Sequence, residues 1–144
     1  MSAFLKWAVL GSVVCILFVR SAAAGLEPSE ASVKSEITAV IEAQLAAFRA
    51  GDFDKAYSFA SSPIREKFPL AEFSQMVKTG YPIIATSVKA DFGICLDNGV
   101  EASIFVHVEA KDGSSKDYQY GLVRERGGWR ITGVTEPEQH GTRV

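Results

Sequence analysis

Apolar residues recur along this chain with two different spacings, and the change between them falls at Tyr81-Pro82. Before that point they return every three to four positions, which is the period of helices with one buried face. After it, apolar and polar residues alternate, as they do in strands that cover a core with one face. This order predicts an α+β domain, in which N-terminal helices pack on a curved antiparallel four-stranded meander sheet.

Three helices are expected in the first half of the chain. The first begins near Ser32, which is expected to cap it, and ends at Gly51, because glycine accepts the left-handed conformation that follows many helices. Asp52 is expected to cap the second helix and Pro63 to end it. The third begins near Pro69, since proline suits a first helical turn. The buried face of the first helix is predicted to consist of Val33, Ile37, Ile41, Leu45 and Phe48.

Turn sequences divide the second half of the chain into four strands. The turns are expected at Asp97-Asn98-Gly99, Lys111-Asp112-Gly113 and Gly127-Gly128. They predict strands near residues 87–96, 100–111, 117–126 and 129–135. Because each connection is short, neighbouring strands are expected to run antiparallel.

Alternation also assigns each strand residue to one face of the sheet. The face covered by the helices is predicted to carry Val88, Ala90, Phe92, Ile94, Leu96, Val100, Ala102, Ile104, Val106, Val108, Ala110, Tyr118, Tyr120, Leu122, Trp129 and Ile131. The outer face is predicted to carry Lys89, Asp91, Cys95, Phe105, His107, Val123 and Val134. The inner face is therefore apolar and phenolic.

The first 24 residues have the pattern of a secretory signal peptide. Lys6 precedes an uncharged apolar stretch over residues 7–19, and small residues follow as far as Ala24. The stretch is shorter than the roughly 20 residues of a spanning helix, so cleavage is favoured over an anchor, although Arg20 would suit an uncleaved segment at the membrane surface. We expect an exported protein, periplasmic or secreted, with a signal peptide at 1–24, a linker at 25–31, one domain at 32–136 and a polar tail at 137–144.

Charge and cysteine content narrow the range of partners. The chain has a net charge of −2, and removal of Lys6 and Arg20 would make the remainder more acidic, which argues against nucleic acid as a partner. Cys15 would leave with the signal, so Cys95 would have no partner for an internal disulfide. A chain of this length can instead stabilise itself by burying about two thirds of its unfolded surface.

Three segments carry a resemblance to a known fold. They are "IEAQLAAFRAGDFDKAYSFASSPIREKF", "FSQMVKTGYP" and "YGLVRERGGWRITGV". Their order resembles the cone-shaped nuclear transport factor 2-like superfamily, and within it the exported group called domain of unknown function 4864. The resemblance implies a fold with a pocket at the mouth of the cone. That superfamily holds enzymes, adaptors and domains without assigned activity, so the fold does not select a function.

Few residues are suited to catalysis. His107 and Asp91 are the candidates for acid-base chemistry, but alternation places both on the outer face, so that a β-bulge would be needed to turn either inward. Cys95 has no nameable base, and the two histidines do not form a ligand set with metal-binding spacing. We therefore expect no metal and no cofactor. Three arginines at the Gly127-Gly128 turn suggest either an anion site or a charged hairpin end with Trp129 packed below it.

The pattern therefore favours binding over catalysis. The expected pocket is lined by Phe48, Tyr57, Phe73, Tyr81, Tyr118 and Tyr120, although these side chains could equally fill the core. Our first interpretation is an exported non-catalytic domain that binds a small apolar ligand or a protein partner. The alternatives are an isomerase, dehydratase or hydrolase that uses the same pocket, and an accessory subunit of an envelope complex. A homodimer is expected to use the outer residues Phe105, His107, Val123 and Val134.

Overall fold

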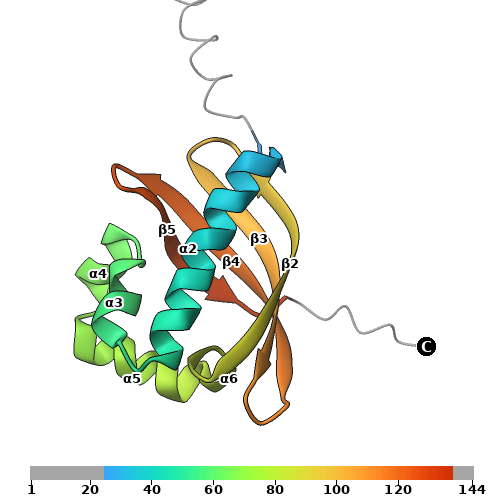
Figure 1. The fold of residues 1–144 in the computed structure, drawn as a ribbon. Helices are drawn as coiled ribbons and strands as arrows, with labels where there is room; N and C mark the ends of the chain where they lie inside the picture. Colours follow the sequence, from blue (N-terminus) through green and yellow to red (C-terminus); the bar gives the residue numbers. More distant parts are fainter. Residues whose placement is uncertain (1–24, 138–144) are drawn as a thin grey trace, which may run out of the picture.

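A five-stranded antiparallel sheet forms one layer of the protein, and helices cover one of its faces (Figure 1). The computed structural model describes residues 25–137. The helices are α2 (Ala31–Arg49), α3 (Phe53–Ser58), α4 (Ser62–Lys67), α5 (Leu70–Gly80) and α6 (Pro82–Ala85). The strands are β1 (Glu27–Pro28), β2 (Ser87–Asp97), β3 (Glu101–Ala110), β4 (Ser115–Glu125) and β5 (Gly128–Thr135), and they pair in that order. The predicted α+β class is confirmed.

The long helix α2 is held by the face that its spacing predicts. Ile37, Ile41 and Leu45 are fully buried against the sheet. After the helix ends, Gly51 takes a φ of +71°, which suits a residue without a Cβ atom. The next helix begins at once, because the Asp52 side chain accepts a hydrogen bond from the Lys55 amide at 3.1 Å.

Two expectations for the helix ends were wrong. The residue before α2 is Glu30, with no side-chain cap, and Ser32 lies inside the first turn. Pro63 does not end a helix but lies in the first turn of α4, and Pro82 lies in the first turn of α6. A proline ring is compatible with a first turn, because the amide it lacks would have no partner there.

The sheet has one more strand than expected. Residues 25–31, predicted as a linker, include β1, whose Glu27 and Pro28 pair with Asp97 and Leu96 of β2. The Ser29 amide continues this ladder with a bond of 2.9 Å to the Cys95 carbonyl. The start of the domain is therefore fixed to the edge of the sheet.

β-bulges change the predicted faces at both ends of the meander. Register shifts in β2 lie between Ser87 and Lys89 and between Phe92 and Cys95. Each extra residue reverses the alternation locally. Cys95 is consequently buried, whereas Val88 and Ile94 are 52% and 75% exposed, opposite to expectation.

Three further positions depart from the predicted faces. After the second bulge of β2, Leu96 pairs with Ser103 and lies on the outer face. The turn that precedes β3 contains Val100, which is 60% exposed. In β5 a register shift lies between Ile131 and Gly133, so Val134 faces the helices rather than the outside.

Elsewhere alternation places the core correctly. The buried residues of β3, β4 and β5 that were predicted to face the helices are Ala102, Ile104, Val106, Val108, Ala110, Tyr118, Tyr120, Leu122, Trp129 and Ile131. Figure 1 shows α2 lying along this face, with α3, α4 and α5 beyond it on the side of β5. The core therefore lies between α2 and the middle of the sheet, and the shorter helices complete the layer beside β5.

Candidate functional site

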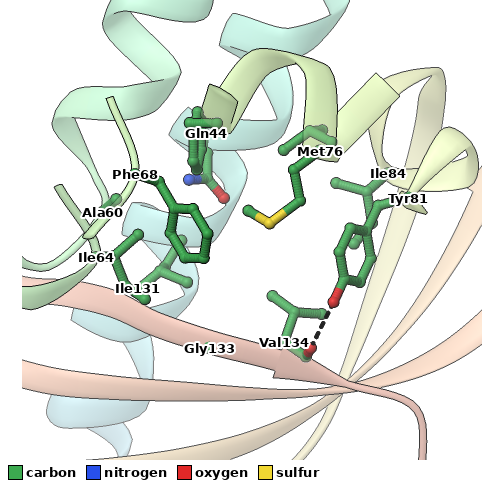
Figure 2. A pocket seen from close by; sticks show the side chains of 12 residues that line it. Gln44, Ala60, Ile64, Phe68, Met76, Tyr81, Ile84, Ile131, Gly133 and Val134 are labelled. Carbon is green, nitrogen blue, oxygen red and sulfur yellow. Dashed lines mark hydrogen bonds between the residues drawn. The ribbon is translucent and has the colours of Figure 1, made fainter. Parts of the chain in front are cut away.

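An apolar cavity lies between the helical layer and β5 (Figure 2). Its volume is about 210 Å³. Half-buried side chains form its rim, and they are Ile64, Phe68, Met76, Tyr81 and Val134. Buried residues form its floor, and they are Gln44, Ala60, Phe73, Val77, Ile84 and Ile131, while Gly133 completes the wall. The half-buried rim marks the side on which the cavity reaches the surface.

Local features of the chain position this lining. The segment after α3 is joined to β5 by two backbone hydrogen bonds, from Ser61 to the Ile131 carbonyl (2.8 Å) and from Ile131 to the Phe59 carbonyl (2.9 Å). The bulge in β5 turns Val134 toward the helices. Tyr81 stands between α5 and α6 and donates its hydroxyl proton to the Val134 carbonyl at 3.1 Å. These contacts hold the cavity walls on separate elements.

Gln44 is the polar side chain of the cavity floor. It is 5% exposed, and its Nε2 donates to the Ala56 carbonyl at 3.1 Å. Because that carbonyl needs a donor, the bond fixes which end of the amide is nitrogen. Figure 2 shows the amide oxygen on the cavity side. None of the described residues that line the cavity carries a formal charge at neutral pH.

Only two of the six predicted pocket aromatics line this cavity, namely Phe73 and Tyr81. Phe48 lies behind Phe73, with ring centroids 6.2 Å apart. Tyr57 packs on Phe73 from α3, with centroids 5.1 Å apart, and its hydroxyl donates to the Phe68 carbonyl at 2.6 Å. Phe48 and Tyr57 therefore build the helical layer around the cavity.

The other two aromatics, Tyr118 and Tyr120, belong to the core. They are 2% and 0% exposed, and burial raises the pKa of both phenols. The Tyr120 hydroxyl has no hydrogen-bond partner among the described residues. A phenol with a raised pKa stays protonated at neutral pH, so neither tyrosine is suited to act as a base.

The residues missed by sequence reasoning are chiefly Gln44, Ile64, Phe68 and Met76. Gln44 did carry a signal, because it lies three residues after Ile41 on the buried face of the first helix. A polar residue on such a face is unusual and marks a hydrogen bond or a site. The others lie on α4 and α5, whose packing on β5 no local pattern indicates.

His107 and Asp91 lie on the outer face, as alternation predicted. The His107 Nδ1 is 2.6 Å from the Asp117 carboxylate, and both side chains are about half exposed. Asp91 pairs with His107 across the strands and lies between the two bulges of β2, where the alternation is undisturbed. His107 and Asp117 border an open groove, whose other lining residues are Phe105, Ser115, Lys116, Glu136 and Pro137. It is separated from the cavity by the sheet.

The outer apolar patch is smaller than expected. Phe105 is 40% exposed and Val123 is half-buried, but Val134 faces the helices. His107, the polar member of the predicted interface, is engaged with Asp117. Phe105 and Val123 are the apolar residues of the predicted interface that remain on this face.

The arginine-rich hairpin already contains its own anion. Glu125 accepts from the Ser62 amide at 3.0 Å. Hydrogen bonding from the Ser62 side chain and amide, with the nearby Arg65 and Arg130, lowers the pKa of Glu125. The Arg130 guanidinium donates to the Trp129 carbonyl at 2.9 Å. The hairpin is therefore a structural end of the sheet, with Trp129 buried beneath it.

Metal ligands do not gather in the part of the chain that the structure describes. Within residues 25–137 no three histidine, cysteine or acidic side chains are placed to share an ion. Cys95 is buried among core residues. No helix over the same residues is long and apolar enough to cross a membrane. The predicted signal segment lies outside the described residues.

Comparison with known proteins supports the fold and the family. No curated protein matches the chain. Among solved structures, the chain is similar to the solution structure of a SEC-C motif containing protein from Rhodopseudomonas palustris, with a TM-score of 0.51 and 13% identity over 69% of this chain and 77% of that one. At this identity the likeness concerns the fold alone. It does not confirm the expected place in the nuclear transport factor 2-like superfamily, which stays a prediction.

A family model gives a more direct match. The model described as Domain of unknown function (DUF4864) matches residues 30–144. This range includes every described helix and the four long strands. The chain therefore belongs to the family Domain of unknown function (DUF4864), as the resemblance of its sequence predicted.

Proposed function

We propose that the protein is a binding domain for a small, neutral, apolar molecule, which occupies the cavity between the helices and β5. The observation that carries this proposal is the cavity of about 210 Å³ with its apolar lining. Ligand sites are commonly concave and apolar, with a small number of polar groups that orient the ligand.

The size of the cavity limits the ligand. Drug-sized molecules take pockets of about 300–1,000 Å³, whereas an apolar cavity of about 150 Å³ is sufficient for benzene. A cavity of about 210 Å³ is suited to a single ring with one or two substituents, or to a branched hydrocarbon of similar size. Longer chains would have to extend through the rim.

Binding is favoured over catalysis by what faces the cavity. Tyr81 is the titratable residue of its lining, and its proton is already donated to the Val134 carbonyl. General acid-base catalysis needs a group that exchanges a proton near the working pH. His107 and Asp91, the candidates for an isomerase, dehydratase or hydrolase, lie on the opposite side of the sheet.

Toluene titration followed by methyl NMR tests the proposal. We expect saturable shifts of the Met76, Val77, Ile84 and Ile131 methyl groups in the wild-type protein. Val134→Phe should abolish them, because the larger side chain would enter the cavity from its rim. The matched control is Val123→Phe, which makes the same change at a half-buried valine of the neighbouring strand on the outer face. Absence of saturable binding to the wild type, or equal binding to both variants, would refute the proposal.

Export is part of the same proposal. The pattern of residues 1–24 supports it, and a cleaved protein would begin at Gly25, two residues before β1. Mass spectrometry of the protein from its own host should give an N-terminus at Gly25. An intact Met1 in the mature protein would instead favour a retained anchor or an internal location.

A further inference from the structure

Gln44 occupies a position that packing alone does not explain. It lies on the buried face of α2, beside Ile41 and Leu45, and it is 5% exposed. A buried amide is unfavourable unless its polar atoms have partners. Its nitrogen is bonded to the Ala56 carbonyl, but that carbonyl also accepts from the Phe59 amide at 3.2 Å. The end of α3 would therefore keep a hydrogen bond without Gln44.

The amide oxygen of Gln44 is the part of this side chain that has no hydrogen-bond partner among the described residues. Figure 2 shows it on the cavity side, opposite Tyr81 and Val134. No backbone or side-chain donor among residues 25–137 makes a hydrogen bond to it. A nearly buried acceptor aimed into an apolar cavity is a site for a donor that arrives with the ligand.

The hydroxyl on the far side of the cavity has the same polarity. Tyr81 donates its single proton to the Val134 carbonyl, so its oxygen faces a ligand as an acceptor only. Both polar side chains of the lining therefore offer oxygen lone pairs. Neither carries a charge that would attract an ion.

We propose that the cavity accepts small neutral ring compounds that carry a hydroxyl or N–H donor, such as phenols, about as well as hydrocarbons of the same shape, because Gln44 Oε1 accepts the donor's hydrogen bond. This inference rests on the proposed function, since it names the class of ligand for the same cavity. It also explains why a glutamine rather than an aliphatic residue stands on the buried face of α2.

Phenol and toluene are matched probes for this proposal, because a hydroxyl and a methyl group have similar size. Without an acceptor in the cavity, phenol would bind roughly 5- to 100-fold more weakly than toluene, because its hydroxyl would lose its bonds to water. With the Gln44 oxygen available, we expect the two dissociation constants in the wild-type protein to agree within about 3-fold.

Gln44→Met then separates recognition from packing, because methionine keeps an unbranched side chain of similar length. We expect phenol to bind roughly 3- to 10-fold more weakly to this variant, and toluene to bind as well as before. Equal losses for both probes would show that Gln44 only supports the cavity walls and would overturn the inference. Calorimetry or methyl NMR on the full chain gives both constants.

The wild-type comparison decides the matter even if the variant does not fold. Phenol that binds at least 10-fold more weakly than toluene would overturn the inference and leave the cavity as a hydrocarbon site. Binding of neither probe would instead refute the proposed function itself. The two failures are therefore distinguishable in a single titration series.

Discussion

The two faces of the sheet differ in what they bury and in what they leave available. The inner face carries Ile104, Tyr120 and Trp129 with almost no exposure, and the cavity beside β5 is lined by apolar side chains. The outer face carries ion pairs between half-exposed side chains, of which His107 and Asp117 are the shortest across strands. The groups suited to chemistry are thus exposed to water, whereas the enclosed space contains none. That separation is the reason that we propose binding rather than catalysis as the function of this cavity.

The largest difference between the faces should appear in stability. Trp129 is 1% exposed, and the Arg124 guanidinium lies 5.4 Å from its ring centre. Trp129→Ala should lower the free energy of unfolding by about 3–5 kcal/mol, because it leaves a large void in the core. Phe105→Ala on the outer face should lower it by about 1 kcal/mol or less. Urea unfolding measures both, and similar losses would remove the distinction between the faces.

Two tyrosine hydroxyl groups, one half-buried and one fully buried, allow a second comparison on the inner side of the sheet. The Tyr57 hydroxyl lies 2.8 Å from the Arg65 carbonyl and 2.6 Å from the Phe68 carbonyl and donates its single proton between them, so Tyr57→Phe should cost about 1 kcal/mol. Tyr120→Phe should cost nothing or raise stability slightly, because its hydroxyl is buried without a partner among the described residues. The same urea titrations test this order, and the reverse order would show that the Tyr120 hydroxyl is bonded in solution.

Glu125 should give the hairpin end a dependence on pH. Hydrogen bonds from Ser62 hold the pKa of Glu125 below its ordinary value of 4.5, so the folded state favours the carboxylate. The resulting stabilisation is present above pH 4.5 and is lost as the pH falls through the lower folded value. At pH 6, Glu125→Gln should therefore reduce stability by about 1 kcal/mol or less.

The pH dependence of that difference is the decisive measurement. Urea titrations of the wild type and Glu125→Gln should converge as the pH falls below 4.5. Ser62→Ala retains the amide donor but removes the hydroxyl, so it should move the pH at which the stabilisation is lost closer to 4.5, because the Ser62 side chain is the largest cause of the lowered pKa of Glu125. A difference that is constant from pH 3 to pH 6 would contradict the role assigned to Glu125.

The smallest effect is expected at the outer ion pair. A double-mutant cycle with His107→Gln and Asp117→Asn should give a coupling energy of about 0.5 kcal/mol, because exposed pairs are solvated and screened. This coupling should shrink in 1 M salt. A coupling of several kcal/mol, unaffected by salt, would mean that the groove is covered in solution by something that excludes water.

The sequence predicted the elements better than it predicted the site. The spacing of Ile37, Ile41 and Leu45 and the alternation around Ile104 depend on local geometry alone, so the buried faces of α2 and β3 follow from the sequence. Cys95 and Val134 were assigned to the wrong face, because a bulge depends on how two strands pair, and neither strand encodes it by itself.

The cavity could not be predicted for a related reason. Its volume is what remains where α4 and α5 meet β5, and this depends on how side chains from distant segments fill the space. The positions of aromatic residues indicate where large side chains lie but not where a cavity remains between them. Phe48 and Tyr118 were therefore expected to line a pocket, but both are buried in the packed core. Phe73 and Tyr81 were predicted and do line the cavity, whereas Gln44 was missed although a polar residue on an apolar helix face is a signal that the sequence carries.

The backbone hydrogen bonds between residues 59–61 and β5 affect how readily the protein would aggregate at high protein concentration. They cover part of the free edge of the last strand, where the amide and the carbonyl of Ile131 would otherwise be open to another chain. At the opposite edge β1 protects only the end of β2, and there the bulges and the charged Lys89 and Asp91 interrupt what would be a flat, pairable strand. The β5 edge is thus covered by a segment of the same chain, whereas the β2 edge is protected by bulges and charged side chains. Both arrangements oppose the edge-to-edge pairing of strands that leads to aggregation.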